Sequence, residues 1–416
     1  MEKRDVAVTI QNLVQFYSIK NGIDGLIKKG YKVDIYVPKT SDTSGFGKMF
    51  DSTYDYLISL NYTPFRESDD ELIYKILLEP YPVDEYIKIN HKYRIKYKYS
   101  LLSAKPNLVY GPSHNIYYDA ILCFGNYEKN ILNVYSNAEI IGNLKYENIK
   151  KLNKPETDKK VLLYLPTYGN VSSIDSILEQ LQQLKDKYYI ITKLHHGTSY
   201  LQDEKDRTNK LMEISDECYN HKTELAELLT IADIVLSDNS GAIFETLYAK
   251  VPLAVYSEDI NKNKLDNFDT TQYRLVKEGY IPYTNHSDEI PNILEQALSS
   301  KYIEKQKNLS DELFYRPENP VGCFVNVIEK YLNDHINFDY KKIHDVLVND
   351  YTSKVNTISQ LSNDLSALQN NSENLARQIE EKNTIISYYE NGKLYRISKK
   401  IYNLYHKIFK RSKKNG

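Results

Sequence analysis

Short apolar runs alternate with helically spaced segments along the first 335 residues of the chain. Residues 5–10 (DVAVTI) form a β-branched run, and residues 11–29 carry apolar side chains at helical spacing. Gly30 is placed to end that helix, and residues 31–37 (YKVDIYV) form a second run before Pro38. Strand, helix and strand in this order predict a βαβ unit, and therefore a parallel sheet.

The remainder of the N-terminal half is less regular. Residues 54–60 are expected to form a strand and residues 72–99 to be helical in part. Two further strands, at 120–124 and 139–141, flank an expected helix over about 127–135. A polar, Pro-containing segment at 148–160 is expected to link two domains.

The same alternation resumes after this linker. Apolar runs at 161–168 (VLLYLPTY) and 189–194 (YIITKL) predict strands, and an apolar segment at 326–332 predicts a helix that could cross back between the domains. The fold class is therefore α/β, with Rossmann-like domains at 1–150 and 151–335. Ligands of such sheets bind at the carboxyl ends of the strands.

The stretch 231–258 (IADIVLSDNSGAIFETLYAKVPLAVYSE) is the most informative one. An apolar run at 234–236 predicts a buried strand, and 242–250 is helical by spacing. Between them, Asn239, Ser240 and Gly241 form a small polar turn at a helix N-terminus. Backbone N–H groups at such a turn suit a phosphate.

The C-terminal region has a different pattern. Apolar residues recur at alternating three- and four-residue steps and predict a coiled coil over 352–390: Ile358, Leu361, Leu365, Leu368, Leu375, Ile379 and Ile386. Residues 391–416 contain nine basic and no acidic side chains, with apolar residues on one helical face. A basic amphipathic tail of this kind is expected to lie on an anionic membrane surface, with a protein partner or a solvated tail as alternatives.

Charge and cysteine content restrict the function. The chain has 54 basic and 56 acidic residues, and setting aside the nine basic residues of the tail leaves 45 basic ones in the first 390. That body does not suit nucleic-acid binding. Three widely separated cysteines indicate neither a disulfide framework nor a zinc site. No apolar run approaches ~18 residues. We therefore expect a peripheral protein at the cytoplasmic face of the membrane.

Several polar side chains are candidates for chemistry at the strand ends. His195 and His196 follow a strand, and adjacent side chains on an extended segment are expected to point to opposite faces. Each is either a site residue or a packed histidine, and His195 is the stronger candidate. Asp238, Ser240 and Gly241 form the turn, and the carboxylate of Glu245 could hold ribose hydroxyls. No metal or cofactor motif is present, so none is expected.

Three blocks, VLLYLPTYGN, ITKLHHGTSY and ELLTIADIVLSDNSGAIFETLYAKVPLAVY, resemble the CDP-glycerol glycerophosphotransferase family of teichoic-acid and capsule-polymer primases and polymerases. The resemblance implies a GT-B fold and no metal in the site. It also implies transfer of glycerol phosphate or a related polyol phosphate from a CDP-activated donor to a lipid-linked or polymer acceptor. Thr167, Lys193, His195, Asp238, Ser240, Gly241 and Glu245 would then contact the donor. His114 is the candidate base by its order along the chain.

Two other functions remain open. One is a GT-B glycosyltransferase that uses a nucleotide sugar, and the other is a non-catalytic scaffold that forms a homo-oligomer through the coiled coil. Release of CMP would indicate polyol-phosphate transfer, and release of UDP or GDP would indicate sugar transfer. A scaffold would bind no nucleotide.

Overall fold

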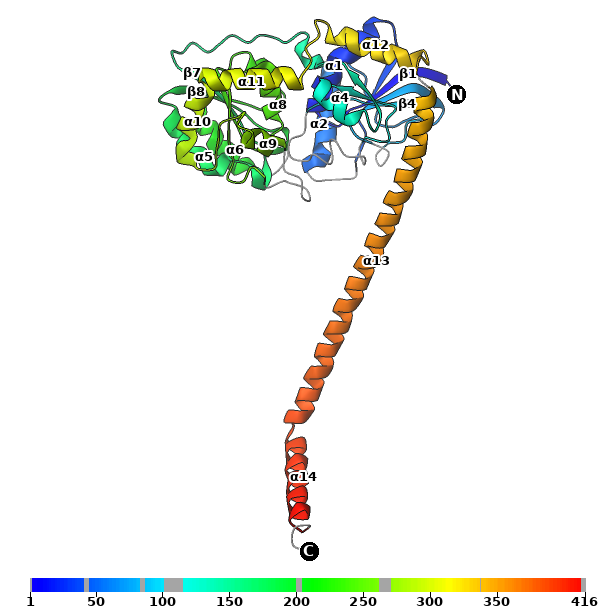
Figure 1. Ribbon diagram of the computed structural model, residues 1–416, viewed down its shortest axis with the longest axis vertical. Helices are drawn as coiled ribbons and strands as arrows, with labels where there is room; N and C mark the ends of the chain where they lie inside the picture. The colour runs from blue at the N-terminus through cyan, green and yellow to red at the C-terminus, as the bar shows by residue number, and fades with distance from the viewer. Residues whose placement is uncertain are drawn as a thin grey trace. The chain divides into compact units, whose positions relative to one another are not determined.

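The computed structural model describes residues 2–40, 45–82, 87–100, 115–199, 204–261, 271–336 and 338–412 (Figure 1). The chain divides into two compact units, residues 1–344 and 345–416, which we describe separately. The first unit holds two six-stranded sheets in which all described pairings are parallel. The expected α/β class with two parallel-sheet domains is confirmed.

The N-terminal sheet has the strand order β2-β1-β3-β4-β5-β6. Its strands are β1 (Glu2–Thr9), β2 (Val33–Tyr36), β3 (Leu72–Glu79), β4 (His91–Lys96), β5 (Ala120–Cys123) and β6 (Asn137–Ile140). Its helices are α1 (Leu13–Lys28), α2 (Gly45–Ser59) and α4 (Asn126–Leu132). The side chain of Asn12 caps α1 by accepting from the backbone N–H of Gln15, and Gly30, at a φ of +91°, follows its end as expected.

Two expectations for this sheet were wrong. Residues 54–60 belong mainly to α2, whose buried side chains Phe50, Thr53 and Leu57 lie three or four residues apart. Residues 72–99 contain β3 and β4, whereas the sequence indicated helix. A nearly continuous apolar run such as 72–79 (LIYKILLE) suits a central strand that is buried on both faces, and periodicity alone does not separate it from a buried helix.

The C-terminal sheet has the order β12-β11-β10-β7-β8-β9. Its strands are β7 (Lys160–Leu165), β8 (Tyr188–Lys193), β9 (Glu217–Tyr219), β10 (Ile234–Ser237), β11 (Leu253–Tyr256) and β12 (Tyr283–Thr284). Its helices are α5 (Ile174–Leu184), α6 (Lys205–Ile214), α7 (Leu225–Leu229), α8 (Ala242–Ala249), α9 (Thr271–Lys277), α10 (Ile290–Ala297) and α11 (Ser300–Leu313). Separate apolar clusters include side chains from alternate positions of its strands.

Helix α12 (Pro320–Leu332) returns to the N-terminal half, as the sequence suggested (Figure 1). Phe324 and Ile328 are fully buried in the same cluster as α1 and the N-terminal strands. Gly22 of α1 permits this approach, because a Cβ there would lie 2.8 Å from the Phe324 ring. The last helix of the unit therefore joins the N-terminal core, although the chain has already completed the C-terminal sheet.

The second unit contains helix α14 (Lys393–Ser412) and most of helix α13 (Phe338–Asn391). Helix α13 begins seven residues before the unit boundary at Asp345. All seven apolar residues of the heptad pattern are more than half exposed in the single chain. Helices therefore form where the periodicity predicted them, while the coiled coil stays a prediction. Within the described ranges, no helix has the length and apolar character needed to cross a membrane.

Candidate active site

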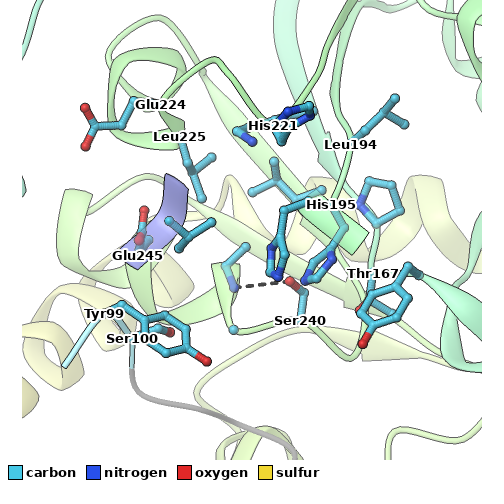
Figure 2. A pocket seen from close by; sticks show the side chains of 18 of the residues that line it. Tyr99, Ser100, Thr167, Leu194, His195, His221, Glu224, Leu225, Ser240 and Glu245 are labelled. Carbon is cyan, nitrogen blue, oxygen red and sulfur yellow. Dashed lines mark hydrogen bonds between the residues drawn. The ribbon is translucent and has the colours of Figure 1, made fainter. Parts of the chain in front are cut away.

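A cavity of about 310 Å³ lies at the carboxyl ends of the C-terminal strands and is closed from the other side by residues of the N-terminal half (Figure 2). The C-terminal half contributes the ends of β7, β8 and β10 and the segment before α7. Val14 and Tyr17 of α1, Tyr99, and Lys145 come from the N-terminal half. The cavity therefore has the position that ligands take in doubly wound sheets.

The turn after β10 provides an anion-binding corner of this cavity. Ser240 and Gly241 line it, and α8 begins directly after them. The Ser240 hydroxyl oxygen accepts from the backbone N–H of Ala242 at 3.2 Å (Figure 2). The Asn239 amide donates to the Ser257 hydroxyl at 2.9 Å. These bonds fix the turn, and the positive end of the α8 dipole suits an anionic group.

Asp238 fixes the neighbouring loops from behind the turn and does not line the cavity. Its carboxylate is completely buried. The backbone N–H of Thr167 donates to both oxygens at 2.9 and 3.0 Å, and the N–H and hydroxyl of Ser173 donate at 3.0 and 2.9 Å. Burial raises the pKa of Asp238 to about 7, although these donors lower it. The geometry gives Asp238 a positioning role, and direct donor contact stays a prediction.

His195 and His196 both line the cavity. Their ring centroids are 4.0 Å apart, and Tyr168 stacks on His195 at 4.6 Å. The expectation that they point to opposite faces was wrong, because β8 ends at Lys193 and a 3₁₀ turn (His196–Ser199) begins directly after His195. Adjacent side chains diverge only while the backbone stays extended.

The His195 imidazole is arranged as a neutral donor. Its Nδ1 accepts from the backbone N–H of Gly197 at 3.0 Å, which leaves Nε2 to carry the proton. Burial, and then the charges of His196 and Lys193, hold the pKa of His195 well below its usual value. Burial, and then the charges of Lys193 and His221, lower the pKa of His196 to about 4. A neutral Nε2–H can donate to a phosphate oxygen without a permanent charge.

Lys193 and Thr167 line the same cavity. Burial lowers the pKa of Lys193 to about 8, with Glu245 acting against the shift and Lys145 adding to it. The Lys193 ammonium group is therefore largely protonated at neutral pH. Thr167 is buried, and Asp238 orients its backbone.

Glu245 lies in the first turn of α8 and is buried. It is only 8% exposed, and its Oε1 accepts from the Lys145 ammonium group, which belongs to the N-terminal half. Its Oε2 is buried and has no hydrogen-bond partner among the described residues, although it belongs to a cavity-lining side chain. One oxygen thus ties the two halves together, and the other is available to a ligand.

Sequence reasoning missed Lys145, His221 and Glu224, which also line the cavity. Burial lowers the pKa of His221 to about 4 and raises the pKa of Glu224 to about 7. For His221, its position directly after β9 was the available signal, because strand ends at one sheet edge converge. His114, the expected base, lies outside the described residues. No group of three or more metal-ligating side chains forms within the described parts of the chain.

The fold and the cavity together define a two-domain protein of the GT-B type. Among solved structures, the wall teichoic acid polymerase TagF has a similar fold, with a TM-score of 0.54 and 14% identity over 80% of this chain and 90% of that one.

Residues 95–316, more than half of the chain, match the model of the CDP-glycerol:poly(glycerophosphate) glycerophosphotransferase family, and the chain belongs to this family. The chain is 26% identical over 168 residues to a teichoic acid poly(glycerol phosphate) polymerase of Bacillus spizizenii, and the match covers 38% of this chain. It is 31% identical over 107 residues to a teichoic acid glycerol-phosphate primase of Bacillus subtilis, over 24% of this chain. The chain spans 41% and 26% of the length of these two relatives.

Proposed function

We propose that this protein transfers glycerol phosphate, or a related polyol phosphate, from a CDP-activated donor to a lipid-linked or polymer acceptor in teichoic-acid or capsule synthesis. The observation that carries the proposal is the convergence of the Ser240–Gly241 turn, the neutral His195 and the Lys193 ammonium in one cavity. Family membership supplies the CDP-linked donor class. Together these groups can hold a diphosphate without a metal ion.

The donor phosphates would occupy the side of the cavity formed by the turn and His195. As the bond between the bridging oxygen and the phosphorus of the polyol phosphate breaks, negative charge grows on the departing CMP. The Nε2–H of His195 and the N–H groups of α8 would stabilise that charge, and one such donor is typically worth ~3 to 4 kcal/mol. His195→Ala should therefore lower turnover by ~100-fold or more.

The test is a donor screen with CDP-glycerol, CDP-ribitol and UDP- and GDP-sugars, with a synthetic short-chain lipid carrying one glycerol phosphate as the acceptor. Product analysis must separate nucleoside monophosphates from diphosphates. CMP release with elongation of the lipid is expected from a CDP-polyol. Release of UDP or GDP would instead indicate sugar transfer, and absence of nucleotide binding would indicate a scaffold.

We further assign the basic tail to an anionic membrane surface at the cytoplasmic side. In α14, Leu394, Ile397, Ile401 and Leu404 are more than half exposed at helical spacing, among basic side chains. Such a helix binds through both apolar burial and charge. Vesicles containing phosphatidylglycerol should sediment the full chain but not the chain truncated after Glu390. Equal sedimentation of the two proteins would contradict this assignment.

A homodimer through α13 is also proposed. The exposed heptad residues would bury their side chains against a second copy. Sedimentation equilibrium should give a dimer, and Leu368→Asp should give a monomer. A full-length monomer at micromolar concentration would refute the proposal.

A further inference from the structure

Glu224 is a cavity residue with no part in the donor site described above. It precedes α7 and lines the cavity close to α1 of the N-terminal half, where the Tyr17 hydroxyl donates to the backbone carbonyl of Lys222 at 3.0 Å. Its Oε1 is buried and finds no hydrogen-bond donor in the described parts of the chain. An unmatched carboxylate oxygen on a cavity wall suits a hydroxyl-bearing ligand.

The surroundings of Glu224 set its proton affinity. Burial raises its pKa to about 7, Lys145 acts against the shift, and Glu245 adds to it. Glu224 interacts electrostatically with six charged or titratable groups: Tyr17 and Lys20 of α1, Lys145, Lys193, Glu227 of α7 and Glu245 of α8. A group with a pKa near the working pH is the most effective general base.

The other titratable groups of the described cavity wall suit this task less well. Burial holds the pKa of His195 well below its usual value and lowers the pKa of His196 and of His221 to about 4, so these imidazoles are weak proton acceptors at neutral pH. The Lys193 ammonium is mainly protonated. One oxygen of Glu245 is engaged by Lys145.

The arrangement of charges also orients the substrates. Figure 2 shows Glu224 and Glu245 on one side of the cavity and Thr167 on the other, with His195 between. A phosphate would be repelled by the carboxylates and attracted by the N–H groups near His195 and Ser240. An uncharged hydroxyl would be held by a carboxylate oxygen.

We propose that Glu224 is the general base that deprotonates the acceptor hydroxyl. This inference rests on the proposed function. The acceptor oxygen attacks the phosphorus of the polyol phosphate, and a new O–P bond forms. The bond from that phosphorus to the bridging oxygen of CMP breaks, and CMP leaves with the electron pair. The acceptor proton passes to the Glu224 carboxylate and then to solvent.

The test compares the wild type with Glu224→Gln, Glu224→Ala and the matched control Glu227→Gln on the same helix. CDP-glycerol and the synthetic lipid acceptor serve as substrates, and calorimetry gives the Kd of CMP. Glu224→Gln should lower kcat by ~100-fold or more and leave the Kd of CMP within about threefold. Glu227→Gln should stay within about twofold of the wild type.

Two readouts separate base catalysis from a structural role. The base is the ionised form, which exists above its pKa, so wild-type kcat/KM should rise with pH and level off above about 7. That acidic limb should vanish in Glu224→Gln, and formate should partly restore activity to Glu224→Ala by replacing the missing carboxylate.

Three outcomes would overturn the inference. Glu224→Gln with wild-type kcat would exclude the base role. A raised Kd for CMP with unchanged kcat would show that Glu224 contacts the nucleoside. Loss of activity in His114→Ala, with little loss in Glu224→Gln, would place the base at His114. If the wild type releases no CMP, the proposed function itself fails, which is a separate result.

Discussion

Removing the carboxylate of Asp238 should reveal how the donor site is held. Asp238 connects the end of β10 to Thr167 after β7 and to Ser173 before α5. Asp238→Ala leaves two buried backbone N–H groups without an acceptor, at about 1 to 3 kcal/mol each. The Ser173 hydroxyl keeps Tyr164 as a partner at 2.7 Å. Relief from burying a carboxylate offsets part of the loss, so we expect a net destabilisation of about 3 kcal/mol.

Asp233 provides a matched control at the other end of the same strand. Its carboxylate accepts from the backbone N–H of Val161 at 2.8 Å and from Lys154, which is half exposed, at 2.7 Å. Asp233→Ala therefore removes a hydrogen bond from a β7 backbone N–H to a carboxylate next to β10, at the end of the strand away from the turn. Its expected cost is about 1 kcal/mol, because an exposed ion pair adds little.

Thermal unfolding and CDP calorimetry together test this reasoning. Asp238→Ala should unfold about 6 to 12 °C below the wild type and bind CDP at least tenfold more weakly, because the Thr167 and Ser240 loops lose their common anchor. Asp233→Ala should unfold about 2 to 4 °C lower with unchanged CDP affinity. Equal losses of affinity in the two variants, or a wild-type unfolding temperature for Asp238→Ala, would refute the positioning role.

The pH dependence gives a second check on the same pair. The pKa of Asp238 in the fold is raised above its unfolded value, so its contribution to stability is complete below about 4 and is lost as pH rises through about 7. The stability deficit of Asp238→Ala relative to the wild type should therefore shrink between pH 5 and pH 8. A deficit that grows with pH would mean that the backbone donors outweigh burial and keep the carboxylate ionised.

Three further predictions concern charge and packing. Because the pKa of Lys193 is about 8, CDP affinity should fall as pH rises above that value, whereas Lys193→Arg should keep its affinity to higher pH in the same calorimetric titration. Lys145→Ala should lower the free energy of unfolding by about 3 to 5 kcal/mol, because it leaves Glu245 buried and unpaired, and adding Glu245→Leu should recover most of that loss in denaturant titrations. Gly22→Ala should cost about 1 to 3 kcal/mol through its 2.8 Å contact with Phe324, and Phe324→Leu in the same chain should reduce that cost.

The features that sequence predicted well have short-range causes. The strand, turn and helix around Ser240 appear where residues 231–258 placed them, and His195 does follow a strand that ends at the same sheet edge. In a parallel sheet, converging strand ends bring such residues together without any knowledge of the other domain. The corner of the cavity formed by His195 and Ser240 could therefore be assembled from local patterns alone.

The features that sequence missed depend on distant contacts. Lys145 and Glu245 are 100 positions apart and meet only because the two halves pack together. Nothing near Glu224 marks it as buried, since the neighbouring α1 lies about 200 residues earlier in the chain. The strand β3 was misread for a related reason, because a strand covered on both faces has no polar side to give it a period of two.

The chemistry of the cavity thus depends on two levels of structure. The proposed anion-binding turn acts through the dipole of α8, which is present wherever that helix forms. The proton affinity of Glu224 has a tertiary origin, because burial between the two halves raises its pKa and Lys145, held by Glu245, limits the rise. A change that separates the halves would expose Glu224 and return its pKa towards that of an ordinary carboxyl, which would make it a weaker base. Donor binding could survive such a change while transfer is lost.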